Sequence, residues 1–236
     1  MSTTPITITR QMGLMAEMRA VANNIANAGT TGFRRTDVVF TEHIDATPEG
    51  ESVSMAVARG GSIDLTQGAI SYTGGTYDLA IEGEGFFRLR TPQGERLTRA
   101  GSFSPDAAGN LATPAGHAVL DAGGAPVRVP AAAGDIVIST DGTVTADGQP
   151  VGRIGLVRPE ETLTLKSEPG PMFATQAQLL PVEGATIRQG HLESSNVNAV
   201  MEITRMIEVQ RAYELGQAFL DRESDRRSKL VDTLTR

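Results

Sequence analysis

Two carboxylates separated by one residue, Glu82 and Glu84, form the arrangement in this sequence that most resembles a catalytic pair. Paired carboxylates serve glycosidases as acid, base or nucleophile, so an exported carbohydrate-active enzyme is one alternative. Residues i and i+2 of a strand share a face, however, and two acids on one face are typical of the side that contacts water. We therefore predict that this pair is not an active site.

Other residues with reactive side chains show no catalytic spacing. The histidines His43, His117 and His191 include no pair at the i, i+4 spacing of a zinc-binding helix. Absence of Cys excludes thiolate nucleophiles, Cys-ligated metals and disulfides. Arg96 and Arg99 are expected to bridge acids of their own domain rather than bind phosphate. The sequence predicts no catalytic residue, no cofactor, no metal and no small-molecule substrate.

Composition and charge argue against a nucleic-acid or membrane partner. The chain has 236 residues and a formal net charge of −7, whereas a nucleic-acid binder needs a basic face. No stretch approaches the ~20 apolar residues that span a bilayer. The start of the chain lacks the basic and apolar segments of a cleavable signal peptide. We expect no nucleic-acid partner, no membrane span and no cleaved signal.

Glycine and proline divide the chain into zones. Residues 60–190 contain 21 of the 26 Gly and 10 of the 12 Pro, which turns require and helix interiors exclude. The pattern predicts a mainly β central domain, sandwich-like or barrel-like, flanked by N- and C-terminal α-helices that pair as a coiled-coil-like unit. The expected segments are an N-terminal helix and loop (1–35), a connecting extended or β segment (36–75), a central β domain (76–160), a return β segment (161–190) and a C-terminal helix (191–236).

The N-terminal helix carries two neighbouring apolar rows. The first steps by 4, 3, 4 and 3 residues, as a heptad seam does, and consists of Leu14, Met18, Val21, Ile25 and Ala28. The second, interrupted by Arg19, consists of Ile8, Met12, Met15, Ala22 and Ala26. Together the rows are wide enough to contact more than one partner helix.

The C-terminal helix has a recognisable start and a weaker seam. Asn198 is a favourable N-cap, with Ala199 as the first helical residue. The expected seam contains two polar positions and runs through Ile203, Met206, Gln210, Tyr213, Gln217 and Leu220.

Turn chemistry indicates short strands in the centre. Asp141-Gly142 and Asp147-Gly148 separate β-branched runs and predict hairpins. Inward-facing positions are expected at Leu79, Ile81, Phe86, Leu89 and Val119.

The stretch "NNIANAGTTGFRR" (23–35) has an ordinary local interpretation. Gly29 can take the left-handed conformation that ends a helix, and Phe33 is an apolar anchor after a turn.

Three ordered motifs nevertheless carry a resemblance. "ANNIANAGTTGFRR" closely resembles the string that closes the N-terminal helix of flagellar rod and hook proteins. "DLAIEGEGFFRL…TRAGSFSPDAAGNLATPAGHAVL" (78–120) is similar to the central motif of that family, and "QGHLESSNVNAVMEITRMIEVQRAYE" (189–214) to its C-terminal motif. The motifs cover both ends and the centre of the chain. Ala199 and Ala112 stand where the family favours Pro and Val.

The resemblance implies a structural subunit of the bacterial flagellar rod, most like the proximal-rod branch. Its terminal helices would line the inner part of a tube in the basal body, where the rod crosses the periplasm. Its partners would be copies of itself, other rod subunits and the flagellar export apparatus. The alternatives are a distal-rod subunit, an exported adhesin or the carbohydrate-active enzyme.

Assembly is expected to depend on the apolar rows and on polar residues of the motifs. The expected interface residues are Leu14, Met18, Val21, Ile25, Asn27, Phe33, Asn196, Asn198, Ile203, Met206, Gln210, Tyr213 and Leu220.

Overall fold

The computed structural model describes residues 4–46, 52–130, 133–182 and 184–234. The chain divides into two compact units, each built from segments that are distant in the sequence. Unit 1 contains Met1–Ala26, Thr36–Ser62 and Asn198–Arg236, and unit 2 contains Asn27–Arg35 and Ile63–Val197.

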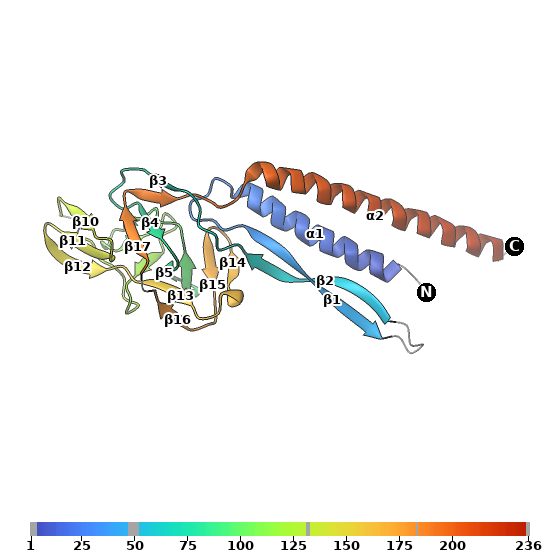
Figure 1. Ribbon diagram of the computed structural model, residues 1–236, viewed down its shortest axis with the longest axis horizontal. Coiled ribbons are helices and arrows are strands. Elements are labelled where there is room, and N and C mark those ends of the chain that lie inside the picture. Colours follow the sequence, from blue (N-terminus) through green and yellow to red (C-terminus); the bar gives the residue numbers. More distant parts are fainter. Residues whose placement is uncertain (1–3, 47–51, 131–132, 183, 235–236) are drawn as a thin grey trace. The chain divides into compact units, whose positions relative to one another are not determined.

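Unit 1 combines two helices with a β-hairpin. Helices α1 (Thr4–Ala26) and α2 (Ala199–Leu234) lie side by side (Figure 1). Strands β1 (Thr36–Ala46) and β2 (Ser52–Ile63) pair in a separate two-stranded sheet. The predicted N-cap is confirmed, because the Oδ1 atom of Asn198 accepts hydrogen bonds from the backbone N–H groups of Val200 at 3.1 Å and Met201 at 3.2 Å.

Unit 2 consists of short strands and one 3₁₀ turn. The first strands of the unit are β3 (Ile70–Tyr72), β4 (Leu79–Glu82), β5 (Phe86–Thr91), β6 (Gly94–Thr98), β7 (Ser104–Pro105), β8 (Leu111–Ala112), β9 (Ala118–Leu120), β10 (Ile136–Ile138) and β11 (Thr143–Ala146). They are followed by β12 (Gln149–Arg153), β13 (Leu156–Pro159), the turn η1 (Thr162–Thr164), β14 (Lys166–Glu168), β15 (Met172–Ala174), β16 (Leu179–Pro181), β17 (Thr186–Gln189) and β18 (His191–Glu193).

One large sheet organises unit 2. It has nine strands, with the path β14-β15-β6-β5-β9-β8-β7, and β13 joins β5 to β16. The remaining described strands of the unit form the three-stranded sheet β10-β11-β12 and the pairs β17-β4 and β18-β3. Each of the last two pairs joins β17 or β18 to a strand more than a hundred residues earlier in the chain.

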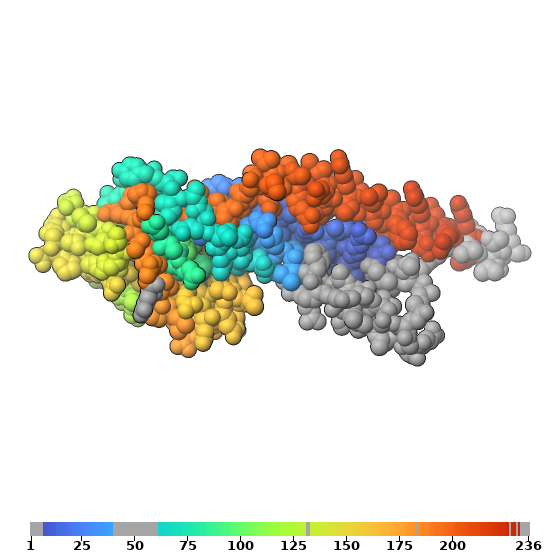
Figure 2. All heavy atoms as spheres, viewed as in Figure 1, coloured from blue at the N-terminus to red at the C-terminus, as the bar shows by residue number. Residues whose placement is uncertain are grey.

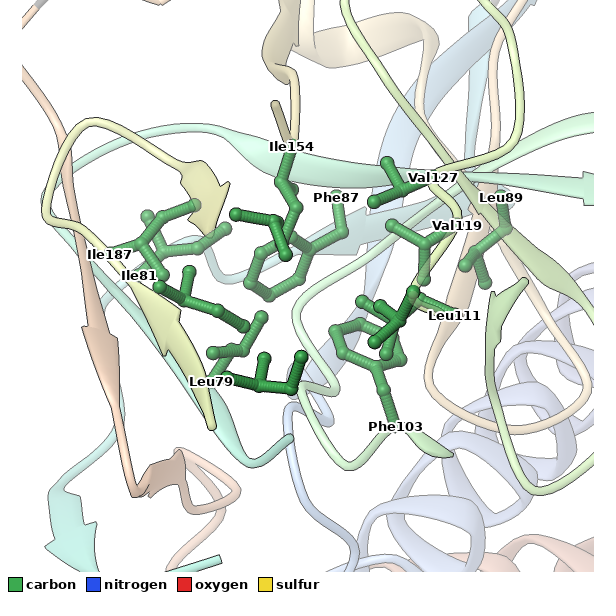
Figure 3. Packing of buried hydrophobic residues seen from close by; sticks show 14 of the residues in the cluster. Leu79, Ile81, Phe87, Leu89, Phe103, Leu111, Val119, Val127, Ile154 and Ile187 are labelled. Carbon is green, nitrogen blue, oxygen red and sulfur yellow. The ribbon is translucent and has the colours of Figure 1, made fainter. Parts of the chain in front are cut away.

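The core of unit 2 lies between these sheets (Figure 3). Leu79, Ile81, Phe87 and Leu89 are almost completely buried, and the rings of Phe87 and Phe103 meet edge to face with centroids 5.2 Å apart. A smaller cluster surrounds Phe86. All five inward positions that we expected are buried, but burial does not alternate along these strands, because Ala80 and Phe87 are buried as well.

Both predicted hairpin turns are present. Asp147 and Gly148 connect β11 to β12 with φ values of 48° and 81°, the two positive angles of a type I′ turn. Gly142, with φ 87°, lies in the connection from β10 to β11.

The predicted fold class was wrong in two particulars. The described strands fall into five separate sheets rather than one sandwich or barrel, and the long β1-β2 pair belongs to the helical unit. The helices do not pair through apolar coiled-coil seams, because the face of α2 that is covered includes Glu202 and Gly216, while Ile203 is 50% exposed. On α1 the covered face includes the polar side chains of Gln11 and Asn24. The predictions of a mainly β centre and of two terminal helices are confirmed.

Candidate assembly site

The loop that follows α1, residues 27–35, is packed into unit 2. The backbone N–H of Thr30 donates to the carbonyl of Asn27 at 3.0 Å, and that of Phe33 donates to Thr30 at 3.2 Å, so the loop makes consecutive tight turns. The residue in the left-handed conformation is Gly32, with φ +68°, and not Gly29 as we expected. A Cβ on Gly32 would collide with the backbone of Arg99 and Ala100, which is why glycine is required there.

Phe33 and Asn196 connect this loop to the segment that follows β18, since the backbone N–H of Asn196 donates to the carbonyl of Phe33 at 3.4 Å. The side chain of Phe33 is 2% exposed. The Oδ1 atom of Asn196 accepts from the N–H of Arg35 at 2.7 Å, and its Nδ2 atom donates to the carbonyl of Asp64 at 2.9 Å. Asn196 therefore connects the loop to a third segment of unit 2 through backbone groups.

A buried ionic cluster lies beside these contacts. Glu193 has no exposed surface, and its carboxylate accepts from Arg34 at 2.5 Å, from Arg99 at 3.2 Å and from the N–H of Gly68 at 2.9 Å. The Arg99 guanidinium also donates to the carbonyl of Gly83 at 2.6 Å and lies 5.5 Å from the centre of the Phe86 ring.

Burial and charge act in opposite directions on the pKa of one arginine in this cluster. Desolvation lowers the pKa of Arg99, and the negative charge of Glu193 opposes that effect. Because two guanidinium groups share one carboxylate, Glu193 is the residue on which the charge balance depends. The expectation that Arg96 and Arg99 bridge acids of their own domain is confirmed, since Arg96 pairs with Glu168 at 2.7 Å.

In unit 1 a second polar cluster joins the helices to β1. The Nδ2 atom of Asn24 donates to Glu202 at 3.1 Å, and Arg205 of α2 donates through Nε to Glu17 at 2.7 Å. Nearer the start of α1, the Nε2 atom of Gln11 donates to the carbonyl of Tyr213 at 2.9 Å. Residue numbers on α2 fall as those on α1 rise, so the helices are antiparallel.

The structure distributes the expected interface residues over both units. In unit 1 Val21 is buried, Leu14, Met18, Ile25, Met206, Tyr213 and Leu220 are half-buried, and Asn198, Ile203 and Gln210 are exposed. In unit 2 Phe33 is buried, whereas Asn27 and Asn196 are half-buried.

Sequence reasoning missed the buried polar residues. Arg34 and Glu193 are separated by 159 positions and Asn24 and Glu202 by 178, so no local spacing connects either pair. All four residues lie inside the quoted motifs. A charged or amide side chain within a motif is the only sequence feature that could have indicated a buried polar contact.

No arrangement typical of catalysis is found among the described residues. Glu82 is half exposed and pairs with Arg188 at 2.7 Å, which accounts for the acid that we considered as part of a catalytic pair. No group of three or more His, Asp or Glu residues in the described part of the chain could hold a metal. Neither described helix is long and apolar enough to cross a membrane.

Comparison with known proteins agrees with the motifs. Residues 80–146 match the flagellar hook protein FlgE/F/G D1 domain, and residues 188–233 match the flagellar basal body rod FlgEFG protein C-terminal model. The chain is 42% identical to the flagellar basal-body rod protein FlgF of Caulobacter vibrioides, over 96% of this chain and 95% of that protein. The chain belongs to the flagellar basal-body rod protein family.

Similarity within the family is graded. The FlgF protein of Mesorhizobium japonicum is 36% identical over 97% of this chain and 96% of its own length. The FlgG protein of Agrobacterium fabrum is 34% identical, over 84% of this chain and 86% of its own length. This member of the rod family is a structural, FlgF-like subunit of the flagellar basal body and not an enzyme.

Proposed function

We propose that the chain polymerises through its terminal helices as a rigid, torque-transmitting segment of the proximal rod. The observation that carries the proposal is the number of large apolar side chains that unit 1 leaves exposed. On α1 and α2 these include Ile8, Met12, Met15, Val200, Met201, Ile203, Ile207, Leu215, Phe219 and Val231. Figure 2 shows side chains of α2, in orange and red, at the surface along the visible length of the helix.

Exposed apolar side chains gathered on one pair of helices are typical of a protein interface. A tube needs heterologous contacts, in which one patch meets a different patch and the repeat does not close on itself. Of the expected interface residues, Ile203 and Gln210 would contact neighbours directly. Val21 and Phe33 would act indirectly, because they hold the shape of the subunit.

The position in the rod follows the graded similarity. FlgF relatives match 96–97% of this chain at 33–42% identity, whereas FlgG relatives match 84–95% of it at 30–34% identity, which favours the proximal over the distal rod. The neighbours would then be FlgB/FlgC-like and FlgG-like subunits together with further copies of this chain. We also propose export through the flagellar apparatus without a cleaved signal peptide. An adhesin would need none of these neighbours.

A matched pair of substitutions tests the role of the helices. Ile207 on α2 and Val137 on β10 are both 46% exposed. In cells that depend on this chain for motility, Ile207→Asp should prevent rod assembly and swimming, whereas Val137→Asp should preserve both. Circular dichroism and thermal unfolding of the purified variants would verify that each remains folded. Normal rods and swimming with a folded Ile207→Asp protein would refute assembly through α2.

A further inference from the structure

Residues 27–35 belong to unit 2, although the chain on both sides of them, in α1 and β1, belongs to unit 1. The chain therefore passes between the two units at four places, after residues 26, 35, 62 and 197. If the loop 27–35 left its site in unit 2, only the last two of these passages would still end there. The docking of this loop thus determines how many chain segments connect the units.

The docked loop is attached largely to residues 193–196, at the end of β18 and just after it. The backbone N–H of Gly32 donates to the carbonyl of Glu193 at 2.8 Å, and the N–H of Asn196 donates to the carbonyl of Phe33 at 3.4 Å. The N–H of Arg35 donates to the side chain of Asn196 at 2.7 Å. Water can replace each of these bonds when the loop leaves, so the net stabilisation that each bond provides is small.

The hydrophobic clusters of unit 2 do not include the loop. Phe33 is buried, but it belongs neither to the cluster of fifteen buried residues that contains Phe87 (Figure 3) nor to the cluster of five that contains Phe86. Release of the loop would therefore expose one large apolar side chain of its own and leave both clusters closed. A local opening that preserves the main core needs less free energy than global unfolding.

Arg34 makes the docked loop less stable than an apolar side chain of the same length would. Arg34 is 1% exposed, and its Nη2 atom donates to Glu193. Its Nε and Nη1 atoms are buried without a hydrogen-bond partner in the part of the chain that the structure describes. Unsatisfied buried donors are unfavourable, whereas water would hydrate all the donors of Arg34 after release.

The charge balance of the buried cluster also favours release. The Glu193 carboxylate already pairs with Arg99 at 3.2 Å, so the docked loop adds a second guanidinium to a single carboxylate. The charge of Arg34 also acts on Asp64, but Asp64 is half-buried and forms its ion pair, at 3.7 Å, with Arg35. Release of Arg34 would leave one carboxylate and one guanidinium in the cluster, which is a balanced pair.

We propose that residues 27–35 form a latch, which opens and closes as one piece while the rest of unit 2 stays folded. Arg34 is the residue that keeps the closed latch easy to open. The turns within the loop, between Asn27 and Thr30 and between Thr30 and Phe33, are local and can persist in the open state. The latch is a property of the free chain and does not depend on the proposed role in the rod.

Native-state hydrogen exchange of the full chain tests the opening. NMR would follow the amides of Gly32, Arg35 and Asn196 at low urea concentrations. We expect one shared opening free energy for these three amides, with protection at least about tenfold below that of the slowest amides in β5 and β9. Protection equal to that of β5 and β9 would overturn the latch, because the loop would then open only with the whole unit. Three unrelated values would overturn opening as one piece.

Arg34→Met tests the role of the arginine. Methionine fills much of the same space without the unpaired donors, and Glu193 keeps its bond to Arg99. Because the closed latch becomes more stable than every open state, protection of the Gly32 and Asn196 amides should rise by roughly fivefold or more. The slowest amides of β5 and β9 should gain the same factor, since Arg34 is hydrated in the unfolded state as well.

The matched control is Arg35→Met, which removes a cation from the adjacent, half-buried position beside Asp64 and should not raise protection. Lower loop protection in Arg34→Met, or failure of that variant to fold, would overturn the role assigned to Arg34. A gain confined to β5 and β9 would show that Arg34 stays buried when the loop amides exchange, and would overturn the latch.

Discussion

The side chain of Asn24 pairs with both backbone polar groups of Thr36. Its Nδ2 atom donates to the Thr36 carbonyl at 3.0 Å, and its Oδ1 atom accepts from the Thr36 N–H at the same distance. Asn24 is 1% exposed and lies on α1, whereas Thr36 begins β1. A helix side chain therefore pairs with the backbone N–H and C=O groups of the first residue of a strand, as the backbone of a neighbouring strand would.

Asn24→Asp should destabilise unit 1. The substitution replaces a donor with a carboxylate oxygen that would face the Thr36 carbonyl and the Glu202 carboxylate, at a cost of about 1–3 kcal/mol. Faster amide hydrogen exchange in α1 and a lower urea midpoint would report the loss. Asn23→Asp adds the same charge at an exposed position and should lower the free energy of unfolding by less than Asn24→Asp does.

A second substitution separates repulsion from a general packing defect. In the double variant Asn24→Asp, Glu202→Gln, the new amide can donate to the new carboxylate, so part of the lost stability should return. A coupling energy of about 0.5–3 kcal/mol is expected for residues in contact. Strictly additive losses would mean that Asn24 and Glu202 do not interact.

Glu193→Gln should destabilise unit 2 strongly. The variant leaves the buried guanidinium groups of Arg34 and Arg99 without a counter-charge, and breaking a buried ion pair in this way costs about 3–5 kcal/mol. The matched control is Glu82→Gln, which breaks the exposed pair with Arg188 and should cost at most about 1 kcal/mol. Equal urea midpoints for the two variants would contradict the importance of burial.

Asp64 makes the stability of unit 2 dependent on pH in the acid range. Burial alone would raise the pKa of its carboxyl group, but hydrogen bonds from Thr66 and the positive charges of Arg35 and Arg34 lower that pKa below 3.8. Because the pKa of Asp64 is lower in the folded state, its carboxylate stabilises the fold at pH values above the pKa of the unfolded state. This contribution is lost as pH falls through the folded-state pKa.

Comparison of the native chain with Asp64→Asn checks this sign. The difference in unfolding free energy between them should be constant near neutral pH and should shrink as pH falls below 3.8. A difference that grows with acidification would contradict the lowered pKa.

Gly216→Ala should separate helix stability from assembly. Alanine favours an α-helix over glycine by about 1 kcal/mol, so the helix content of the free chain should not fall. The added Cβ would displace the end of Gln11 and break its hydrogen bond to the Tyr213 carbonyl, so the pairing of α1 with α2 and rod assembly should weaken. Ala218→Gly, at an exposed position of α2, should reduce helix content without a specific loss of assembly. Normal assembly by Gly216→Ala would argue against a role for this helix contact in assembly.

Local chemistry in the sequence determined several elements by itself. An asparagine ahead of an apolar run determines the start of α2, because its side chain satisfies the N–H groups that the helix leaves unpaired. Asp147-Gly148 determines a hairpin, because few other residue pairs tolerate positive φ at both positions. The short apolar run Leu79, Ala80 and Ile81 determines a strand that is buried on both faces.

Tertiary structure decided which face of each helix is covered and which polar residues pair. Apolar residues lie on several sides of α2, so periodicity alone could not distinguish the covered row, with Val209, from the exposed row, with Ile203 and Ile207. Glu193 acquires its role only when residues 159 and 94 positions away reach its carboxylate. Such contacts depend on how distant segments pack in three dimensions, which a spacing rule over one or two helical turns does not contain.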